Sequence, residues 1–436
     1  MRVVGALGIW TGDRELDGAR TLTWREGRIA GDGERGPVDE ELDATGCIVT
    51  PGLVNAHHHL LQSAFRSLPG AHHVPMRRWL QTMAAAYRRV GVDPELVSAA
   101  ASVGLAESLS CGVTTVADHH LTWPAAGDHL ALAGSTLEAA RALGARLVFV
   151  RGSAGDDPER AAAEAEELVG ALGVGPGGVS ADGMVQLAVG PAGVHSDRRE
   201  TFELLGQVAA RFGLRRRTQA NEQVDVRVAR ARYRRRPLAL LEEWGWLAPD
   251  VTVAHLCRIT AEEIRRLAAS GASATHAPGC DLPAGWGIAP FGALLEHGVT
   301  VGLGTSGGGS NDAGHLLADA RLAVQVAPLA RPAGETVTAR VALAAATRGS
   351  ALGLGRSELG TLEQGGAADL CCWDLTGVAD AGVSDRLAGL LWASPGRRPR
   401  HVVVAGRVVV RDYVVTSGDE TELAQRLNRL ISSKGA

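Results

Sequence analysis

The chain has 436 residues, of which 45% are hydrophobic and 21% are charged. This composition excludes a disordered or fibrous protein, and the length predicts one large α/β domain plus a smaller one. The formal net charge of -4 and the low aromatic content of 4% argue against a nucleic-acid partner, because they provide neither a basic surface nor many rings for base stacking.

The cysteines and the N-terminus predict a cytoplasmic protein. Six cysteines are scattered along the chain without a CxxC pair or a regular spacing, which favours reduced thiols over a disulfide framework. The first residues, "MRVVGALGIWTGDRELDG", contain a short apolar run followed at once by acidic residues, unlike a signal peptide. No segment reaches the roughly 18 uninterrupted apolar residues of a membrane span, so we expect no membrane partner.

The two ends of the chain carry short strands. Residues 1–50 contain the apolar runs "VVGALGIWT" and "CIVT" and the hairpin-like "TLTWREGRIA". Residues 353–436 return to strands with "ADLCCWDL" and "HVVVAGRVVVRDYVV" and are expected to finish in a helix. We predict that both ends together form one small β-sandwich domain.

The middle of the chain, residues 51–352, alternates β-branched apolar runs with helical stretches such as "DPERAAAEAEELVGALG". The strand candidates are "GLVNAHHH", "VTTVADHH", "RLVFVRGS", "MVQLAVGPA", "LRRRTQANE", "VTVAHLC", "ASATHAP" and "TVGLGTSG". Eight such alternations predict an α/β fold of the (β/α)8 TIM-barrel type.

Polar residues cluster at the expected C-terminal ends of these strands, where barrel enzymes place their catalytic groups. They are His57, His59, Asp118, His119, Arg151, Gln219, Glu222, His255, His276 and Ser306. Within "HHH", His57 and His59 lie two apart on a strand and share a face, which suits Zn²⁺ or Fe²⁺. A hydrogen-bonded polar plug is the alternative. The arginine run "LRRRTQ" is expected to form a solvated or ion-paired surface.

Several motifs resemble those of the amidohydrolase superfamily, among them "PGLVNAHHHLLQSAFRS", "SCGVTTVADHH", "SNDAGHLLADAR" and "GTLEQGGAADLCCWDL". The similarity covers nearly the whole chain. It is greatest to the branch of 8-oxoguanine deaminases, hydroxyatrazine-type aminohydrolases, and cytosine and guanine deaminases. The resemblance implies the barrel and split β domain described above, and a hydrolase acting on C–N bonds of a nitrogen heterocycle.

In that branch one divalent metal is held by the HxH pair, a histidine that ends strand five and an aspartate that ends strand eight. By this resemblance, His57 and His59 match the pair, Glu222 matches a proton-shuttling glutamate, and His255 and His276 match histidines of strands six and seven.

Two metal-ligand positions depart from the branch pattern. The strand-five pattern H-T-H-L-A-E is "RTQANE" here, and the strand-eight pattern G-L-G-x-D-G is "GLGTSG". Gln219 and Ser306 therefore replace a histidine and an aspartate. A neutral amide and a hydroxyl are weak zinc ligands, and the loss of the aspartate also removes the base of the branch mechanism.

We therefore expect no tightly bound cofactor and a metal-independent mechanism in which imidazoles and a carboxylate move the protons. The predicted catalytic residues are Glu222, His255, His276, His57 and His59. The alternative is a weakly bound divalent metal, Zn or Fe, held by His57, His59 and His255. Asp118, Asp281 and Cys280 lie in loops from which a further ligand could come.

A small heterocyclic substrate is expected to contact five further residues. Gln219 and Ser306 stand at the changed ligand positions, and Asp312 belongs to the family motif "SNDAG". Arg151 could donate hydrogen bonds to a substrate oxygen, and Trp286 could stack on a flat ring. Structural ion pairing for Arg151 and core packing for Trp286 are the alternatives.

The sequence alone leaves three functions open. The first is a divergent hydrolase that cleaves a C–N bond of a small nitrogen heterocycle, by deamination or by ring or amidine hydrolysis. The second is a lyase or isomerase that uses the same pocket. The third is an inactive paralogue that binds a small molecule or a partner subunit. Relatives in this branch are often dimers, so a homodimer is also open.

Overall fold

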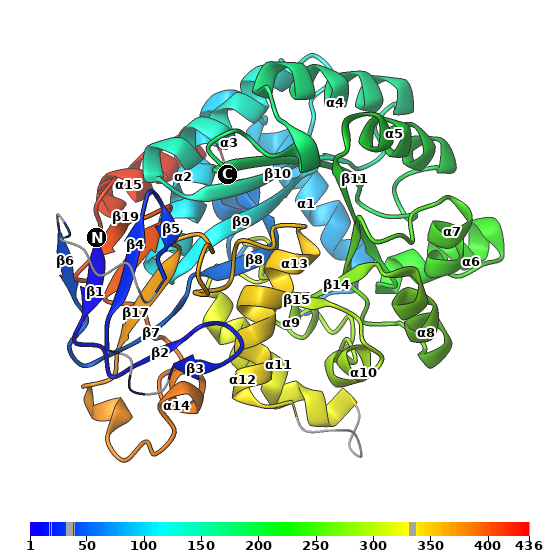
Figure 1. Ribbon diagram of the computed structural model, residues 1–436. Coiled ribbons are helices and arrows are strands. Elements are labelled where there is room, and N and C mark those ends of the chain that lie inside the picture. The colour runs from blue at the N-terminus through cyan, green and yellow to red at the C-terminus, as the bar shows by residue number, and fades with distance from the viewer. Residues whose placement is uncertain (17, 19, 32–37, 39, 331–336, 436) are drawn as a thin grey trace.

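The computed structural model describes residues 1–16, 18, 20–31, 38, 40–330 and 337–435, and its centre is a barrel of parallel strands (Figure 1). The strands pair in the order β15-β14-β13-β12-β11-β10-β9-β8-β16. Because β15 and β16 are two pieces of one stretch of chain, the sheet closes on itself. The strands are β8 (Leu53–His59), β9 (Val113–His120), β10 (Arg146–Ser153), β11 (Val185–Pro191), β12 (Arg215–Ala220), β13 (Val251–His255), β14 (Ser273–His276), β15 (Val301–Leu303) and β16 (Ser306–Gly307).

This architecture confirms the predicted (β/α)8 barrel. All eight predicted strands coincide with observed ones, and "VTTVADHH" and "RLVFVRGS" match β9 and β10 residue for residue. Both strands are buried along their whole length, which explains why they appear in the sequence as nearly continuous apolar runs.

The eighth strand differs from the prediction because it is interrupted at Gly304 and Thr305. A side chain at position 304 would meet the backbone oxygen of His57 at 2.7 Å, so glycine lets the strand pass close to β8. The Thr305 hydroxyl accepts a hydrogen bond from Asn55 Nδ2 at 2.8 Å and lies 2.9 Å from His58 Nδ1. The interruption thus fixes β16 against β8 where the three histidines begin.

Helices cover the outside of the barrel (Figure 1). They are α1 (Met76–Val90), α2 (Pro94–Ser110), α3 (His129–Leu143), α4 (Pro158–Leu172), α5 (Arg199–Phe212), α6 (Gln223–Tyr233), α7 (Pro237–Glu243), α8 (Ala261–Ser270), α9 (Pro278–Asp281), α10 (Phe291–Glu296), α11 (Leu316–Ala330), α12 (Ala339–Ala344) and α13 (Ser350–Gly353). The predicted helix α4 begins after Asp157, which caps the Arg160 N–H, and ends at Gly173 in the left-handed region. No described helix is both long and apolar enough to span a bilayer.

The two chain ends meet beside the barrel in two further sheets (Figure 1). One sheet contains β1 (Arg2–Val4), β4 (Leu22–Arg25), β5 (Arg28–Ile29) and β6 (Glu41–Asp43). The other contains β2 (Gly8–Trp10), β3 (Glu15–Leu16), β7 (Cys47–Pro51), β17 (Leu370–Asp374), β18 (His401–Val404), β19 (Arg407–Arg411) and β20 (Val414–Val415). The C-terminal part also contains α14 (Arg386–Trp392) and the terminal helix α15 (Glu420–Ser433).

The sandwich has an apolar core of its own, which includes Val3, Trp24, Leu42, Val49 and Leu370. The prediction of a small β-sandwich from both chain ends is therefore confirmed. The run "VVGALGIWT" differs from the prediction in forming two strands rather than one. Gly5, at φ +77, turns the chain between β1 and β2, so that each joins a different sheet.

A buried ion pair joins the barrel to the sandwich. Arg146, at the start of β10, donates from Nε to Asp369 Oδ2 at 2.7 Å and from Nη2 to Asp369 Oδ1 at 2.9 Å. Asp369 precedes β17 and also accepts a hydrogen bond from the Ala405 N–H at 2.7 Å. Both charged side chains are almost fully buried, so each depends on the other for its solvation.

Removing one partner of this pair should destabilise the fold. We expect Asp369→Ala to lower the free energy of unfolding by about 3 to 5 kcal/mol, because it leaves the Arg146 guanidinium buried and unpaired. Urea denaturation measures the change. The exposed pair Arg2–Glu41 offers a matched control, and Glu41→Ala should change the stability far less. Equal losses in both variants would contradict a special role for the buried pair.

Candidate functional site

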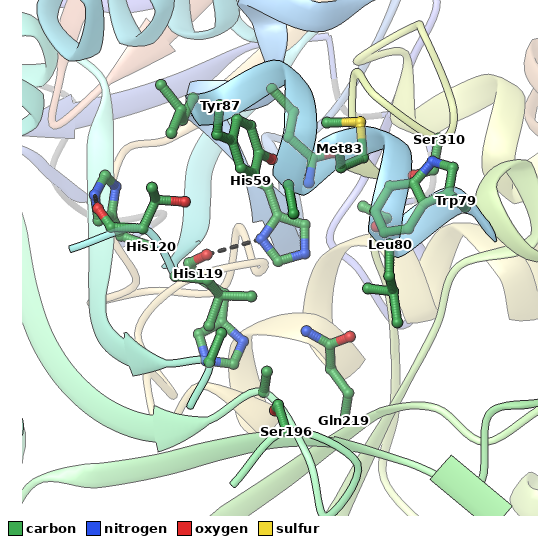
Figure 2. A pocket seen from close by; sticks show the side chains of 18 of the residues that line it. His59, Trp79, Leu80, Met83, Tyr87, His119, His120, Ser196, Gln219 and Ser310 are labelled. Carbon is green, nitrogen blue, oxygen red and sulfur yellow. Dashed lines mark hydrogen bonds between the residues drawn. The ribbon is translucent and has the colours of Figure 1, made fainter. Parts of the chain in front are cut away.

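A cavity of about 750 Å³ opens at the C-terminal ends of the barrel strands. Strand ends and the loops that follow them supply its polar surface, while α1 supplies apolar side chains (Figure 2). The polar lining residues include His59, Asp118, His119, His195, Gln219, Glu222, His255, Cys280 and Ser306. A concave site of this size, with one apolar wall and a few converging polar groups, suits a small molecule.

The HxH histidines lie at one side of this cavity. The pairing of β8 with β9 shifts register between Asn55 and His58, a bulge that changes the direction of the side chains. His59 points into the cavity and donates its Nδ1–H to the His119 carbonyl at 2.7 Å (Figure 2), which leaves Nε2 free. His57 is only 1% exposed, and its ring centroid lies 4.8 Å from that of His59 and 5.0 Å from that of His255.

Both histidines are held neutral. Burial lowers the pKa of His57 well below its usual value, and the charges of neighbouring histidines and of Arg217 lower it further. Burial also lowers the pKa of His59 to about 4, despite the hydrogen bond to His119. Neutral imidazoles are suited to accept a proton or to bind a metal.

Glu222 and His255 are two neighbouring ionisable groups of the site. Glu222 follows β12, and its Oε1 lies 4.0 Å from His255 Nε2. The other ring nitrogen of His255, Nδ1, donates to Asp281 Oδ1 at 2.8 Å. Burial raises the pKa of Glu222 to about 7, although His255 and His195 act in the opposite direction. Burial alone would lower the pKa of His255, but the charges of Asp281 and Glu222 outweigh it and raise the pKa to about 9.

Strained backbone marks the same strand ends. Asn221, His255, Leu256 and Ser306 all have positive φ angles, of 55°, 70°, 61° and 56°. Residues with a side chain rarely adopt this left-handed conformation, and it persists only where the surrounding structure enforces it. The conformation turns the chain sharply after β12 and β13 and at β16, and brings Glu222, His255 and Ser306 to the cavity.

The sequence interpretation missed the wall formed by α1. Met76, Trp79, Met83 and Tyr87 recur at intervals of three or four residues in "MRRWLQTMAAAY" and all line the cavity (Figure 2). Trp79 is held in place because its Nε1 donates to the Gly309 carbonyl at 2.8 Å. The helical periodicity of these residues is visible in the sequence, but it does not distinguish a cavity wall from a core.

Arg217 is the second residue that the sequence interpretation missed. The expected surface for "LRRRTQ" holds for Arg216, which pairs with Asp250 at 2.6 Å, but is wrong for Arg217. Arg217 is 3% exposed, points into the barrel and donates from Nη2 to the Ala56 carbonyl. Among the described residues, no carboxylate forms an ion pair with it. Burial, with a smaller contribution from Arg215, lowers the pKa of Arg217 to about 9, so the guanidinium stays charged at neutral pH.

The usual metal position of the family does not fit a divalent cation here. It would be formed by His57, His59, Gln219 and Ser306, a set without an anionic ligand. His57 Nε2 is buried without a hydrogen-bond partner among the described residues and could bind a metal, but Gln219 offers only a neutral amide oxygen and Ser306 only a hydroxyl, both of which are weak ligands. Arg217, whose charge already lowers the pKa of His57, adds a fixed positive charge next to this position.

A second group of possible ligands lies around His255, whose ring centroid is 5.0 Å from that of His57. Within the described ranges, one ligand atom each of His255, Cys280 and Asp281 lies within 4.8 Å of the others. All three residues are buried, and such a set suits zinc chemically. His255 Nδ1 and Asp281 Oδ1, however, already satisfy each other by a hydrogen bond.

Two predicted substrate-binding residues lie away from the cavity lining. Arg151 is 0% exposed and is bound by Asp156 at 2.8 Å and by Glu164, and its guanidinium lies over the Trp123 ring. The structural ion pair, the alternative named above, therefore accounts for Arg151. Asp312 accepts hydrogen bonds from Ser67 and His72 in a more exposed part of the loop. Neither placement supports contact with a substrate in this cavity.

The remaining predicted residues lie in or next to the cavity. Trp286 lines it and packs edge-to-face against Trp79, with ring centroids 5.4 Å apart. Gln219 and Ser306 also line it. His276 is buried beside Phe291, and both of its ring nitrogens lack hydrogen-bond partners among the described residues. Cys280 and Asp281, which the sequence interpretation treated only as spare ligands, complete the wall next to His255.

Known proteins resemble this chain over nearly its whole length. The chain is 34% identical to 8-oxoguanine deaminase of Pseudomonas aeruginosa, with 94% of each chain covered. It is 32% identical to 5-methylthioadenosine/S-adenosylhomocysteine deaminase of Halobacterium salinarum, over 100% of this chain and 99% of the other. Its structure is similar to that of atrazine chlorohydrolase from Arthrobacter aurescens complexed with zinc, with a TM-score of 0.91, 35% identity and 99% of each chain covered.

The match to a family extends over most of the chain. The model of the Amidohydrolase family matches residues 48–409, which span the barrel and reach from β7 of the sandwich to β19. The chain therefore belongs to the amidohydrolase family.

Proposed function

We propose that this protein hydrolyses a carbon–nitrogen bond of a small nitrogen heterocycle, with Glu222 moving the protons and His255 stabilising the Glu222 carboxylate. The observation that carries the proposal is the buried contact between these two groups at the cavity wall. The two relatives named above are deaminases, and the structural neighbour is a hydrolase of a heterocycle, which supports the same reaction class.

The proposed reaction replaces a ring amino group by oxygen. Water adds to the ring carbon, the carbon–nitrogen bond breaks, and ammonia leaves. Glu222 takes the proton of the attacking water and delivers a proton to the departing nitrogen, which a carboxylate with a pKa near 7 can do in both directions. His255, held by Asp281, stabilises the Glu222 carboxylate and orients it. Ring opening or amidine hydrolysis would use the same groups.

The rest of the cavity fits a flat, partly apolar ring. Trp79 and Trp286 provide aromatic surface, and Gln219, Ser306 and His59 provide hydrogen-bonding groups. In this proposal Gln219, Ser306 and Trp286 contact the substrate, whereas His57 and His276 act from behind the lining as neutral hydrogen-bonding groups.

The proposal has no step that uses a metal at His57, His59, Gln219 and Ser306, because these side chains do not fit one. Metal-independent catalysis thus stays a prediction from the sequence, supported by the donor set and by the charge of Arg217. The zinc bound in the structural neighbour makes a direct metal analysis the necessary test.

Replacing the carboxylate tests the proton-transfer role. We expect Glu222→Gln to lower kcat by about 100-fold or more, because an amide cannot accept the proton of water. Ammonia release from aminated purines, pyrimidines and triazines measures the activity. Glu200→Gln, on the exposed surface of α5, is the control and should behave like the parent. If Glu222→Gln kept more than about a tenth of the activity, Glu222 would not be the proton carrier.

The pH dependence follows from the raised pKa of Glu222. Glu222 must be ionised to accept a proton and His255 must keep its proton to stabilise it, so kcat/KM should be level between about pH 7 and pH 9 and fall about tenfold per pH unit below pH 7. A profile of kcat/KM against pH for the best ring substrate checks this. If kcat/KM instead fell with a midpoint near pH 4.5, the ordinary pKa of a glutamate, burial would not be raising the pKa of Glu222.

Metal content can be measured directly. We expect the purified protein to hold well below one equivalent of zinc or iron and to keep its activity after prolonged chelation. One tightly held equivalent whose removal abolishes activity would overturn the metal-free proposal. Two variants would then locate the metal: loss of the metal in Cys280→Ser would place it at the His255 group, and loss in His59→Ala would place it at the histidine pair.

A further inference from the structure

We infer that Arg217 makes this cavity select rings that carry a negative charge, so that an anionic oxo-heterocycle supplies the counter-ion that the barrel lacks. The inference deepens the proposed function and depends on it for the identity of the reaction. The buried charge of Arg217 below the cavity floor is what favours an anionic ligand.

Arg217 is a buried cation without an anionic partner. Its guanidinium is 3% exposed, and its hydrogen bond goes to the Ala56 carbonyl, a neutral group. Its Nε has no hydrogen-bond partner among the described residues. Buried arginines are normally neutralised, as Arg146 is by Asp369 and Arg151 is by Asp156 and Glu164 in this same barrel. A buried charge left alone is costly, so an anionic ligand is stabilised when it binds nearby.

The charge lies close enough to act on a ligand. Gln219 lines the cavity, and Arg217 lies two residues earlier on the same face of β12, one layer deeper in the barrel. Two residues of a strand correspond to about 7 Å. The guanidinium also donates a hydrogen bond to the carbonyl of Ala56, the residue next to His57, so it lies beside the histidine motif.

The groups between Arg217 and the cavity can also bind an anion. Gln219 extends into the cavity towards His59 (Figure 2), and its Nε2 amide donor has no partner among the described residues. Ser306, at the start of β16, also lines the cavity and can donate its hydroxyl proton. A deprotonated oxo-heterocycle presents acceptor oxygen and nitrogen atoms to such donors.

The carboxylates around the cavity do not neutralise Arg217. Asp281 is paired with His255, and Glu222 lies 4.0 Å from that same imidazole. Asp118 accepts a hydrogen bond from the Leu60 N–H at 2.8 Å. No described acidic side chain lies within ion-pair distance of Arg217. The cavity therefore has a cation below its floor, and the carboxylates at its wall face other groups.

Direct binding tests the inference without turnover. Isothermal titration calorimetry at neutral pH and low salt compares barbiturate, an anionic pyrimidine ring, with uracil, a neutral ring of similar size. We expect the parent to bind barbiturate more tightly. In Arg217→Met barbiturate should bind about 10- to 100-fold more weakly, the effect of one charge over about 7 Å at an effective dielectric constant of about 20. The affinity for uracil should change by less than about threefold.

Arg216→Met is the matched control, because Arg216 lies on the same strand, faces the other way and has its own partner in Asp250. It should leave both affinities unchanged.

Gln219→Glu is the second variant, which keeps the test decisive if Arg217→Met does not fold. It places a carboxylate next to the guanidinium, and should abolish the preference for barbiturate while uracil still binds.

The preference is refuted if the parent does not bind barbiturate more tightly than uracil, or if the ratio of the two affinities is the same in the parent, Arg217→Met and Gln219→Glu. The ammonia assay separates this failure from failure of the proposed function. Ammonia released equally well from neutral rings would overturn the charge preference and leave the hydrolase. A barbiturate preference that depends on Arg217, without ammonia release from any ring, would confirm the anion site and overturn the hydrolase.

Discussion

The close approach of the eighth barrel strand to the first is the constraint on which the site depends. Gly304 has no side chain because the backbone of His57 occupies that space, and Thr305 is bound to Asn55 and lies beside His58. This contact closes the barrel and fixes the direction from which the histidines reach the cavity. It also forces Ser306 into a left-handed conformation at the point where the family has a metal-binding aspartate.

Within the closed barrel, the buried charges form two groups. Arg217, below Gln219 on β12, is a cation that stays charged at neutral pH. At the end of β13, Asp281 and Glu222 lie beside His255 and raise its pKa, so that the imidazolium neutralises them. In our proposal the first group attracts a ligand by its charge and the second exchanges protons with the ligand. Both functions use the low dielectric of the interior, where each charge acts over a longer range than in water.

The sequence was sufficient for the fold because the barrel strands are buried on both faces and carry unmistakable apolar runs, as in β9 and β10. It also placed Gln219, Glu222 and His255 at one site, since strand ends meet at one end of a barrel. It failed for Arg151 and Arg217 for a single reason. Whether an arginine faces a carboxylate depends on how the chain packs around it: Asp156 and Glu164, in the loop and helix after β10, reach Arg151, whereas no carboxylate of the described residues pairs with Arg217.

The changes at and next to the family's metal position all make it less suited to bind a cation. Relative to the branch pattern, position 217 gains a positive charge, position 219 exchanges a metal-binding nitrogen for an amide, and position 306 loses a negative charge. Each change alone weakens cation binding, and in our proposal the three together favour an anion at this position. Random loss of ligands would not require a buried arginine, which is costly unless something compensates it. In our proposal Glu222, His255 and Asp281 supply the acid–base groups, and a bound anion balances the charge of Arg217.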